Sequence, residues 1–87
     1  ELPREHYDRI IHDPPRISES SGLLYSLDFY KKLFAVLRRG GILYHYTGES
    51  GRLRKVNLPG KVSSRLKRAG FEVLFYDEKS LGIVARK

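Results

Sequence analysis

The alternation of strand-like and helix-like segments constrains this 87-residue chain more than any other feature. A β-branched run over 7–12 stops at Asp13-Pro14-Pro15, because proline cannot continue a sheet ladder. Apolar residues at helical spacing then predict a helix over about 26–38, and a second strand follows over 41–46. Because strands joined through a helix run parallel, these two segments predict one right-handed βαβ unit.

The second half of the chain repeats the alternation and then departs from it. A helix is expected over about 60–69, with Gly70 as its stop, and a third strand over 71–76. The turn at 77–80 is too short for a crossover, so a fourth strand over 81–86 must run antiparallel to the third. The predicted fold is α/β, in the order strand-helix-strand-helix-strand-strand, with helices on the faces of the sheet and the last strand antiparallel.

The first predicted helix carries signals at both ends. Ser26 can cap its N-terminus, Arg38 and Arg39 would occupy its last turn, and Gly40 would end it. Its apolar stripe consists of Leu27, Tyr30, Leu33, Phe34 and Leu37.

Composition excludes several classes of protein. The chain has no cysteine, so it has no disulfide framework and no thiolate nucleophile. No apolar run approaches the ~20 residues that cross a bilayer, and the N-terminal residues do not resemble a signal peptide, so we expect a cytoplasmic protein without membrane contact. There is no methionine either, and the chain begins at Glu1, so we expect it to be one piece of a longer protein.

The positive charge is concentrated in the second half. The net charge is +7, and residues 45–87 carry ten Lys and Arg against four Asp and Glu. Such an excess can attract RNA or another anionic substrate, although solvated helix faces give the same pattern and no aromatic residues interleave the clusters. The clusters are Arg52, Arg54 and Lys55, and then Lys61, Arg65, Lys67 and Arg68.

The order of elements, read with particular residues, resembles the C-terminal half of a class I S-adenosylmethionine-dependent methyltransferase. The resemblance covers residues 5–87 and rests on the strand ending in Asp13-Pro14-Pro15, on Arg39-Gly40-Gly41-Ile42-Leu43, on Gly70-Phe71-Glu72-Val73 and on the final hairpin. It implies a partial Rossmann-like sheet in which the last strand inserts antiparallel between its two neighbours. Residues 24–30 and 39–43 look most like the spermidine-synthase-like branch and its uncharacterised archaeal relatives.

Within that resemblance the whole chain, residues 1–87, is the C-terminal portion of one domain whose N-terminal, cofactor-binding half is absent. The glycine-rich turn and the acidic ribose partner of the family have no counterpart here, so S-adenosylmethionine would bind mainly outside this chain, which we expect to be inactive alone. The first strand has no upstream neighbour, and its free edge would pair with the missing half or with a second copy.

The candidate site lies where the first two strands end, because ligands of open α/β sheets bind beyond the carboxyl ends of strands. Asp13 would sit beside an attacking amine, with Pro14 and Pro15 fixing nearby backbone carbonyls; the alternative is an aspartate that only forms the turn. Asp13-Pro14-Pro15 also resembles the motif of amino-methyltransferases that act on nucleobases, but that motif ends in an aromatic residue where this chain has Arg16. The departure argues against base stacking at this position and leaves the methyl acceptor open, as an amine or a nucleobase-type group. The assigned residues are Asp13, Pro14 and Pro15 as catalytic, Arg16, Tyr46 and Thr47 as substrate-binding, and His12 and Asp13 as cofactor-binding.

The same residues are compatible with other functions. His12 and His45 would lie near each other on adjacent strands, but Asp13 is the only nearby acid, so we expect no metal site. A spermidine-synthase-like aminopropyltransferase would share the scaffold, yet its cationic substrate favours acidic residues over this basic second half. A basic nucleic-acid-binding module without catalysis is the alternative from another class.

Overall fold

The computed structural model describes residues 5–14, 22–47 and 58–87, and within them it gives the predicted alternation of strands and helices. Pro15, Arg16 and the cluster Arg52, Arg54 and Lys55 lie outside the described residues. The elements are β1 (Tyr7–His12), the 3-10 helix η1 (Gly22–Tyr25), α1 (Leu27–Val36), β2 (Leu37–Tyr46), α2 (Leu58–Ala69), β3 (Glu72–Asp77) and β4 (Gly82–Arg86). In this described part no helix is long and apolar enough to cross a membrane.

The four strands form one mixed sheet in the order β1-β2-β4-β3. β1 pairs parallel with β2, and β4 pairs antiparallel with both β2 and β3. The last strand is therefore antiparallel, as predicted, and it lies between β2 and β3. The first three strands share one direction, because β2 and β3 both oppose β4.

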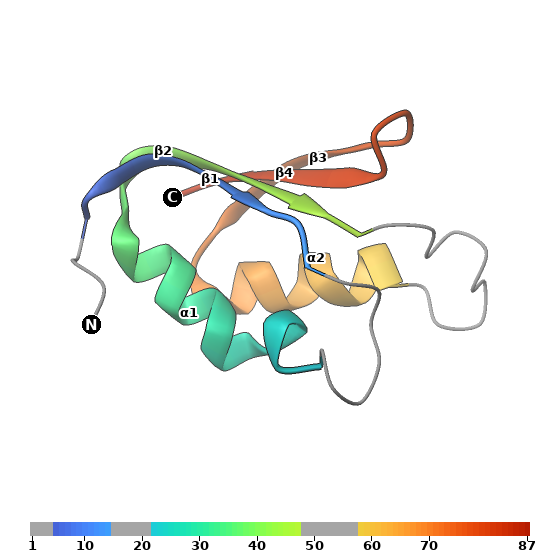
Figure 1. The fold of residues 1–87 in the computed structure, drawn as a ribbon, viewed down its shortest axis with the longest axis horizontal. Helices are drawn as coiled ribbons and strands as arrows, with labels where there is room; N and C mark the ends of the chain where they lie inside the picture. Colours follow the sequence, from blue (N-terminus) through green and yellow to red (C-terminus); the bar gives the residue numbers. More distant parts are fainter. Residues whose placement is uncertain (1–4, 15–21, 48–57) are drawn as a thin grey trace.

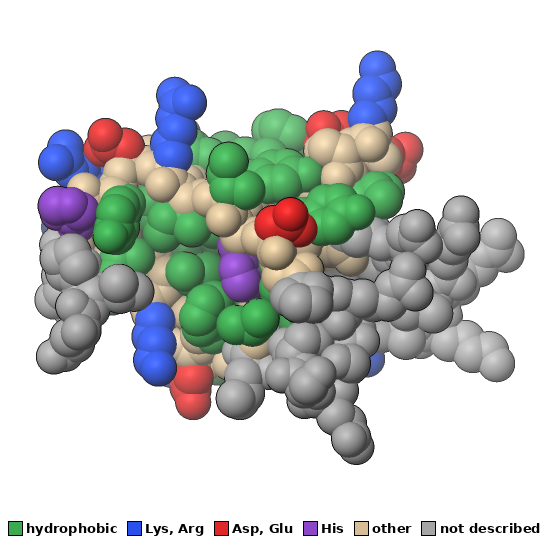
Figure 2. All heavy atoms as spheres, viewed as in Figure 1, with side chains coloured by type: hydrophobic (Ala, Val, Ile, Leu, Met, Phe, Trp, Pro, Cys, Tyr) green, Lys and Arg blue, Asp and Glu red, His purple; other side chains and the backbone are tan. Residues whose placement is uncertain are grey.

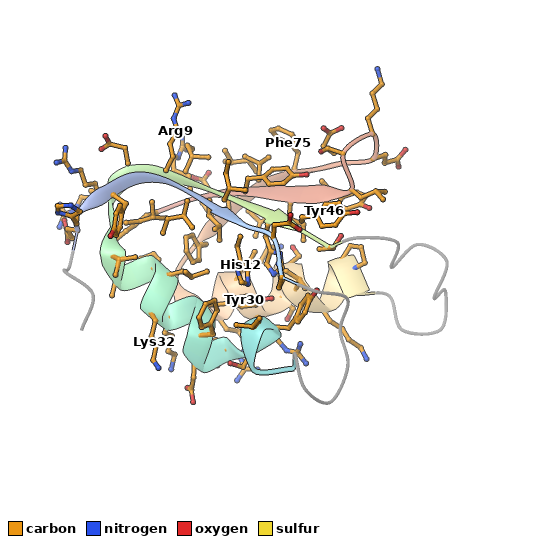
Figure 3. The ribbon with its side chains drawn as sticks, in the orientation of Figure 1. Arg9, His12, Tyr30, Lys32, Tyr46 and Phe75 are labelled. Atoms are coloured by element: carbon orange, nitrogen blue, oxygen red, sulfur yellow. The ribbon has the colours of Figure 1, made fainter. Side chains whose placement is uncertain are left out.

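Both helices lie on the same side of the sheet, with the other side left open (Figure 1). The sequence predicted helices on the faces of the sheet without this asymmetry. The reason is topological: the chain moves from β1 to β2 and on toward β3 in one direction, and right-handed crossovers in one direction put their helices on one face. Arg9 and Phe75 lie on the open side, and His12 and Tyr30 lie between the sheet and α1 (Figure 3).

The core fills the space between the sheet and the two helices. Leu43 and Ile83 are buried from the sheet side, and Val62 and Leu66 from α2. The buried cluster consists of Tyr25, Tyr30, Leu33, Leu37, Leu43, Val62, Leu66, Phe71, Ile83 and Ala85. The open side instead leaves Ile11 77% exposed and Phe75 56% exposed, so the sheet is buried on one face only.

α1 begins as predicted and ends earlier. The Ser26 side chain accepts a hydrogen bond from the Phe29 backbone N–H at 3.1 Å, which confirms the cap. The prediction that Arg38 and Arg39 occupy the last helical turn was wrong: the helix stops at Val36, and Leu37 already has extended backbone. Leu37 is fully buried and pairs with Tyr7, so the gain from extending the sheet outweighs two more helical residues.

The segment gained by β2 is accommodated by an irregularity in the sheet. Between the pairs Tyr7↔Leu37 and Arg9↔Ile42 the register shifts, because β2 contributes more residues than β1. Gly40 has a φ of 80° there, which a side chain would disfavour.

The second helix, α2, starts at Leu58 and not at 60, because Pro59 is compatible with the first helical turn.

Replacing Gly82 is expected to destabilise the sheet. A Cβ on Gly82 would overlap the Tyr44 ring, whose hydroxyl donates to the Ser80 carbonyl at 3.0 Å. We expect Gly82→Ala to lower the free energy of unfolding by about 1–3 kcal/mol, the usual effect of overpacking, measured by urea denaturation. In the Tyr44→Ala background the same substitution should have a much smaller effect; an equal effect in both backgrounds would contradict the packing explanation.

Candidate functional site

The parallel pairing of β1 with β2 brings the predicted site residues to one edge of the sheet. His12 pairs with His45 in register, so Asp13, which directly follows β1, and Tyr46, the last residue of β2, lie at the carboxyl ends of adjacent strands. Asp13 is exposed, and no ion pair or hydrogen bond of its carboxylate is found among the described residues, whereas Pro14 is buried. A carboxylate held at the surface by a buried neighbour is available to an external ligand.

His12 points away from the open face and is engaged within the fold. Its Nε2 donates to the Leu24 carbonyl at 2.8 Å, in the tautomer that this acceptor requires. The ring lies 5.0 Å from that of Phe29 and 4.6 Å from that of His45, measured between centroids. Burial lowers the pKa of His12, although the Leu24 carbonyl and Asp13 act in the opposite direction. The ring is thus neutral near pH 7, and its hydrogen bond to the Leu24 carbonyl connects β1 to η1.

His45 is fully buried beneath the sheet, and both of its ring nitrogens have partners. Nδ1 donates to the Tyr46 carbonyl at 3.0 Å, which leaves Nε2 as the acceptor for the Tyr30 hydroxyl at 2.7 Å. Burial lowers the pKa of His45 to about 3, His12 lowers it further, and the Tyr46 carbonyl opposes the shift. Protonation would remove the acceptor and bury a charge, so the ring stays neutral.

Two tyrosines complete this aromatic cluster. The rings of Tyr25 and Tyr30 lie 5.5 and 5.4 Å from that of His45. Burial raises the pKa of both hydroxyls, so neither ionises near pH 7. The sequence assigned Tyr30 only to an apolar helical stripe, but its hydroxyl is the partner of a buried histidine. The alternation Leu43, His45 on the helix-facing side of β2 was the signal that such a partner was required.

The residues after β2 are used partly inside the fold. The Thr47 hydroxyl and backbone N–H both donate to the Leu81 carbonyl, each at 2.9 Å, and the residue is 3% exposed. Tyr46 is half-buried and pairs with Gly82 across the sheet. Thr47 therefore closes the β3–β4 turn against β2, whereas Tyr46 keeps part of its surface accessible at the edge.

Arg65 connects α2 to the same region, and the sequence placed it only in a basic cluster. Its guanidinium donates to the Tyr25 carbonyl at 3.3 Å. η1 therefore lies between two contacts, from His12 on one side and from Arg65 on the other. This arrangement links the carboxyl edge of the sheet to the basic face of α2.

At the carboxyl ends of β1 and β2, the exposed carboxylate of Asp13 lies beside the neutral aromatic cluster, whose histidine nitrogens are hydrogen-bonded within the fold. Within the described ranges, no three His, Cys, Asp or Glu side chains gather in a way that could hold a metal ion. The histidines act as structural groups that fix the ends of β1 and β2. Asp13 is the group that could accept a hydrogen bond from a ligand.

Removing the Tyr30 hydroxyl should leave a buried acceptor without its donor. We expect Tyr30→Phe to reduce the free energy of unfolding by about 1–3 kcal/mol, because Nε2 of His45 would be desolvated and unpaired. Tyr44→Phe is the matched control, since its hydroxyl donates at an exposed position and its loss leaves Ser80 accessible to water. Equal losses of stability in urea denaturation would show that burial does not increase the contribution of the Tyr30–His45 hydrogen bond.

Comparison with known proteins gives relatives that are longer than this chain. No protein-family model matches the chain. An uncharacterized protein of Methanocaldococcus jannaschii is 46% identical over 84 residues, which are 95% of this chain and 29% of that protein. A crystal structure of a possible exported protein from Bordetella parapertussis superimposes with a TM-score of 0.66 at 17% identity, covering 99% of this chain and 40% of that one. The chain thus spans less than half the length of either of these proteins, and the structural likeness establishes a shared fold alone.

Proposed function

We propose that this chain is the acceptor-side half of an S-adenosylmethionine-dependent methyltransferase that methylates an amine or nucleobase-type nitrogen. The observation that carries the proposal is the sheet order β1-β2-β4-β3, in which the last strand is inserted antiparallel. The sequence resemblance implies this arrangement, which ordinary dinucleotide-binding sheets lack. The exposed Asp13 at the carboxyl edge supports the same assignment.

The described residues do not form a site for the cofactor by themselves. His12, which the resemblance assigned to cofactor binding, uses Nε2 on Leu24 and packs its ring against Phe29 and His45. The hydroxyl of Thr47 is likewise bonded to Leu81. Two of the described polar residues that were assigned to the site have no hydrogen bond from their side chains to other described residues. They are the exposed Asp13 and the half-buried Tyr46. In this proposal the cofactor is held mainly by residues outside the 87.

Asp13 has a defined part in such a reaction. A nitrogen nucleophile must present its lone pair to the methyl donor while its hydrogens are held elsewhere. The Asp13 carboxylate can accept one N–H and so orient the lone pair, and it offsets the positive charge that develops on the nitrogen. The buried Pro14 fixes the backbone next to it, so the carboxylate is held without a large loss of chain entropy.

The test is transfer of a labelled methyl group by the product of the full open reading frame that encodes this chain. We expect label from S-adenosylmethionine to appear on an amine or nucleobase acceptor in a panel of small amines, nucleosides and RNA. Label appearing as an aminopropyl group from the decarboxylated donor would favour the spermidine-synthase-like alternative. RNA binding without any transfer would favour the non-catalytic nucleic-acid-binding module.

A further inference from the structure

A shallow groove of about 420 Å³ runs along one face of α2. Its lining consists of Gly60, Lys61, Ser64, Arg65 and Arg68. The three cations stand at positions i, i+4 and i+7, so they lie on one side of the helix along about 10 Å of its axis. The opposite side of α2 carries the buried Val62 and Leu66, so the basic face is the surface that the fold leaves outward.

The charge of this groove is not neutralised within the described parts of the chain. No carboxylate there lies within ion-pairing distance of Lys61, Arg65 or Arg68, whereas Arg38, Arg86 and Lys87 each pair with an acidic side chain. Arg65 is oriented by its hydrogen bond to the Tyr25 carbonyl. The groove therefore presents three positive groups and a serine hydroxyl to whatever binds it.

The lining also indicates the class of partner. Protein interfaces centre on buried aromatic or aliphatic anchors, and none of the lining residues that the structure describes has an aromatic or aliphatic side chain. Lys, Arg and Ser, which line this groove, are among the side chains that contact phosphate backbones. A row of cations along a helix suits a chain of phosphates better than a single anionic group.

The groove is continuous with the candidate site through η1. Arg65 contacts the Tyr25 carbonyl at one end of η1, and His12 contacts the neighbouring Leu24 carbonyl, with Asp13 next in the chain. η1 therefore contacts both the last residue of β1 and α2. A polymer bound along α2 would thus pass close to the exposed Asp13.

From this placement we propose that the α2 groove binds the phosphate backbone of a single-stranded nucleic acid, so that the methyl acceptor is a base within a polynucleotide. The reading of the bound strand as substrate rests on the proposed function, whereas the binding surface itself does not. A single strand fits because its bases reach an exposed carboxylate without the unpairing energy that a duplex would require.

The experiment measures fluorescence anisotropy of a labelled 20-nucleotide single-stranded RNA with the full reading-frame product at several salt concentrations. We expect Lys61→Gln/Arg68→Gln to weaken binding about tenfold or more and to reduce the slope of log K against log salt by about 1.4, because two phosphate contacts are lost. Arg65 is kept, since its bond to Tyr25 is structural. Lys32→Gln/Lys79→Gln removes the same charge from α1 and from the β3–β4 turn and should leave affinity nearly unchanged.

The outcomes separate this proposal from the function on which it partly rests. Polyglutamate, an anionic polymer without phosphates, serves as a second labelled probe. Equal weakening of RNA binding by both double variants, no RNA binding at all, or a loss of affinity for polyglutamate without a loss of affinity for RNA would each overturn the groove as a nucleic-acid surface. S-Adenosylmethionine binding that persists in such a case leaves the methyltransferase proposal standing. Groove-dependent RNA binding without cofactor binding would support the surface and contradict the methyltransferase. Circular dichroism and the single substitutions Lys61→Gln and Arg68→Gln exclude loss of folding as the cause.

Discussion

The chain is expected to lose about 2 kcal/mol of folding stability between pH 7.5 and pH 5, because the native state requires a neutral His45. Its pKa is about 3 in the folded chain and 6.5 when exposed. The unfolded state therefore binds more protons throughout this window, so stability is complete above about pH 6.5 and falls as the pH drops, approaching about 1.4 kcal/mol per pH unit. The lowered pKa of His12 acts in the same direction.

Urea denaturation at half-unit steps from pH 7.5 to 5 measures this dependence. Exposed carboxyl groups titrate mainly below this range, so the histidines dominate it. We expect His45→Asn to flatten the curve strongly, whatever it does to stability at pH 7.5, and His12→Asn to flatten it less. Wild-type stability that does not vary with pH would show that His45 is not buried in contact with Tyr30 as described.

Replacing Asp13 is expected to abolish most of the transfer activity of the full reading-frame product. Asp13→Asn keeps the size of the side chain and removes the charge that would offset a developing ammonium. The loss of one such preorganised group lowers kcat by about 10²- to 10³-fold in other enzymes, and we expect a loss near the lower value here because Asp13 is solvent-exposed. Substrate affinity should change less than kcat, since the charge develops during the reaction.

Asp8→Asn is the matched control, because Asp8 lies near the start of β1, whereas Asp13 directly follows its end. Its carboxylate is exposed and pairs with Arg38 at 3.4 Å, an ion pair of small energetic value at the surface. Activity should therefore be unchanged in Asp8→Asn. If the two variants lose the same activity, or if Asp13→Asn stays fully active, Asp13 is only a turn-forming residue.

The order and type of the elements were predictable because strong local signals agreed with one another. The proline stop after β1, the Ser26 cap and the short turn before β4 each decide a local conformation that tertiary packing did not overrule. The antiparallel last strand followed from loop length alone. The end of α1 was predicted wrongly because burial of Leu37 and its pairing with β1 are long-range effects, which the local helix signals of Arg38 and Gly40 cannot report.

The closeness of the candidate residues at the strand ends was predictable, and their internal hydrogen bonding was not. The carboxyl ends of parallel strands had to bring His12 close to His45, and they do. That Tyr30 and the Leu24 carbonyl would take up the histidine nitrogens depends on where α1 and η1 pack, which no local pattern specifies. The same packing bonds His12 to the Leu24 carbonyl and leaves Asp13 exposed.

The open face of the sheet is the other feature that sequence patterns left undecided. Hydrophobic side chains are visible along the side of the molecule that carries the β1 edge (Figure 2). Ile11 is the most exposed of the large hydrophobic residues described, and it lies on β1, one of the two outer strands of the sheet. The expectation that an upstream half of the domain or a second copy pairs with β1 rests on this outer position, and the exposed side chains on the open face are a separate feature.

Calorimetric titration with S-adenosylmethionine, of the full reading-frame product and of the 87-residue chain side by side, tests the proposed division of the methyltransferase. We expect stoichiometric binding to the full product and none to the isolated chain, whose described residues supply no cofactor cradle. Tight binding by the chain alone would contradict the division of the site proposed above. A folded full product that binds no cofactor would contradict the methyltransferase itself.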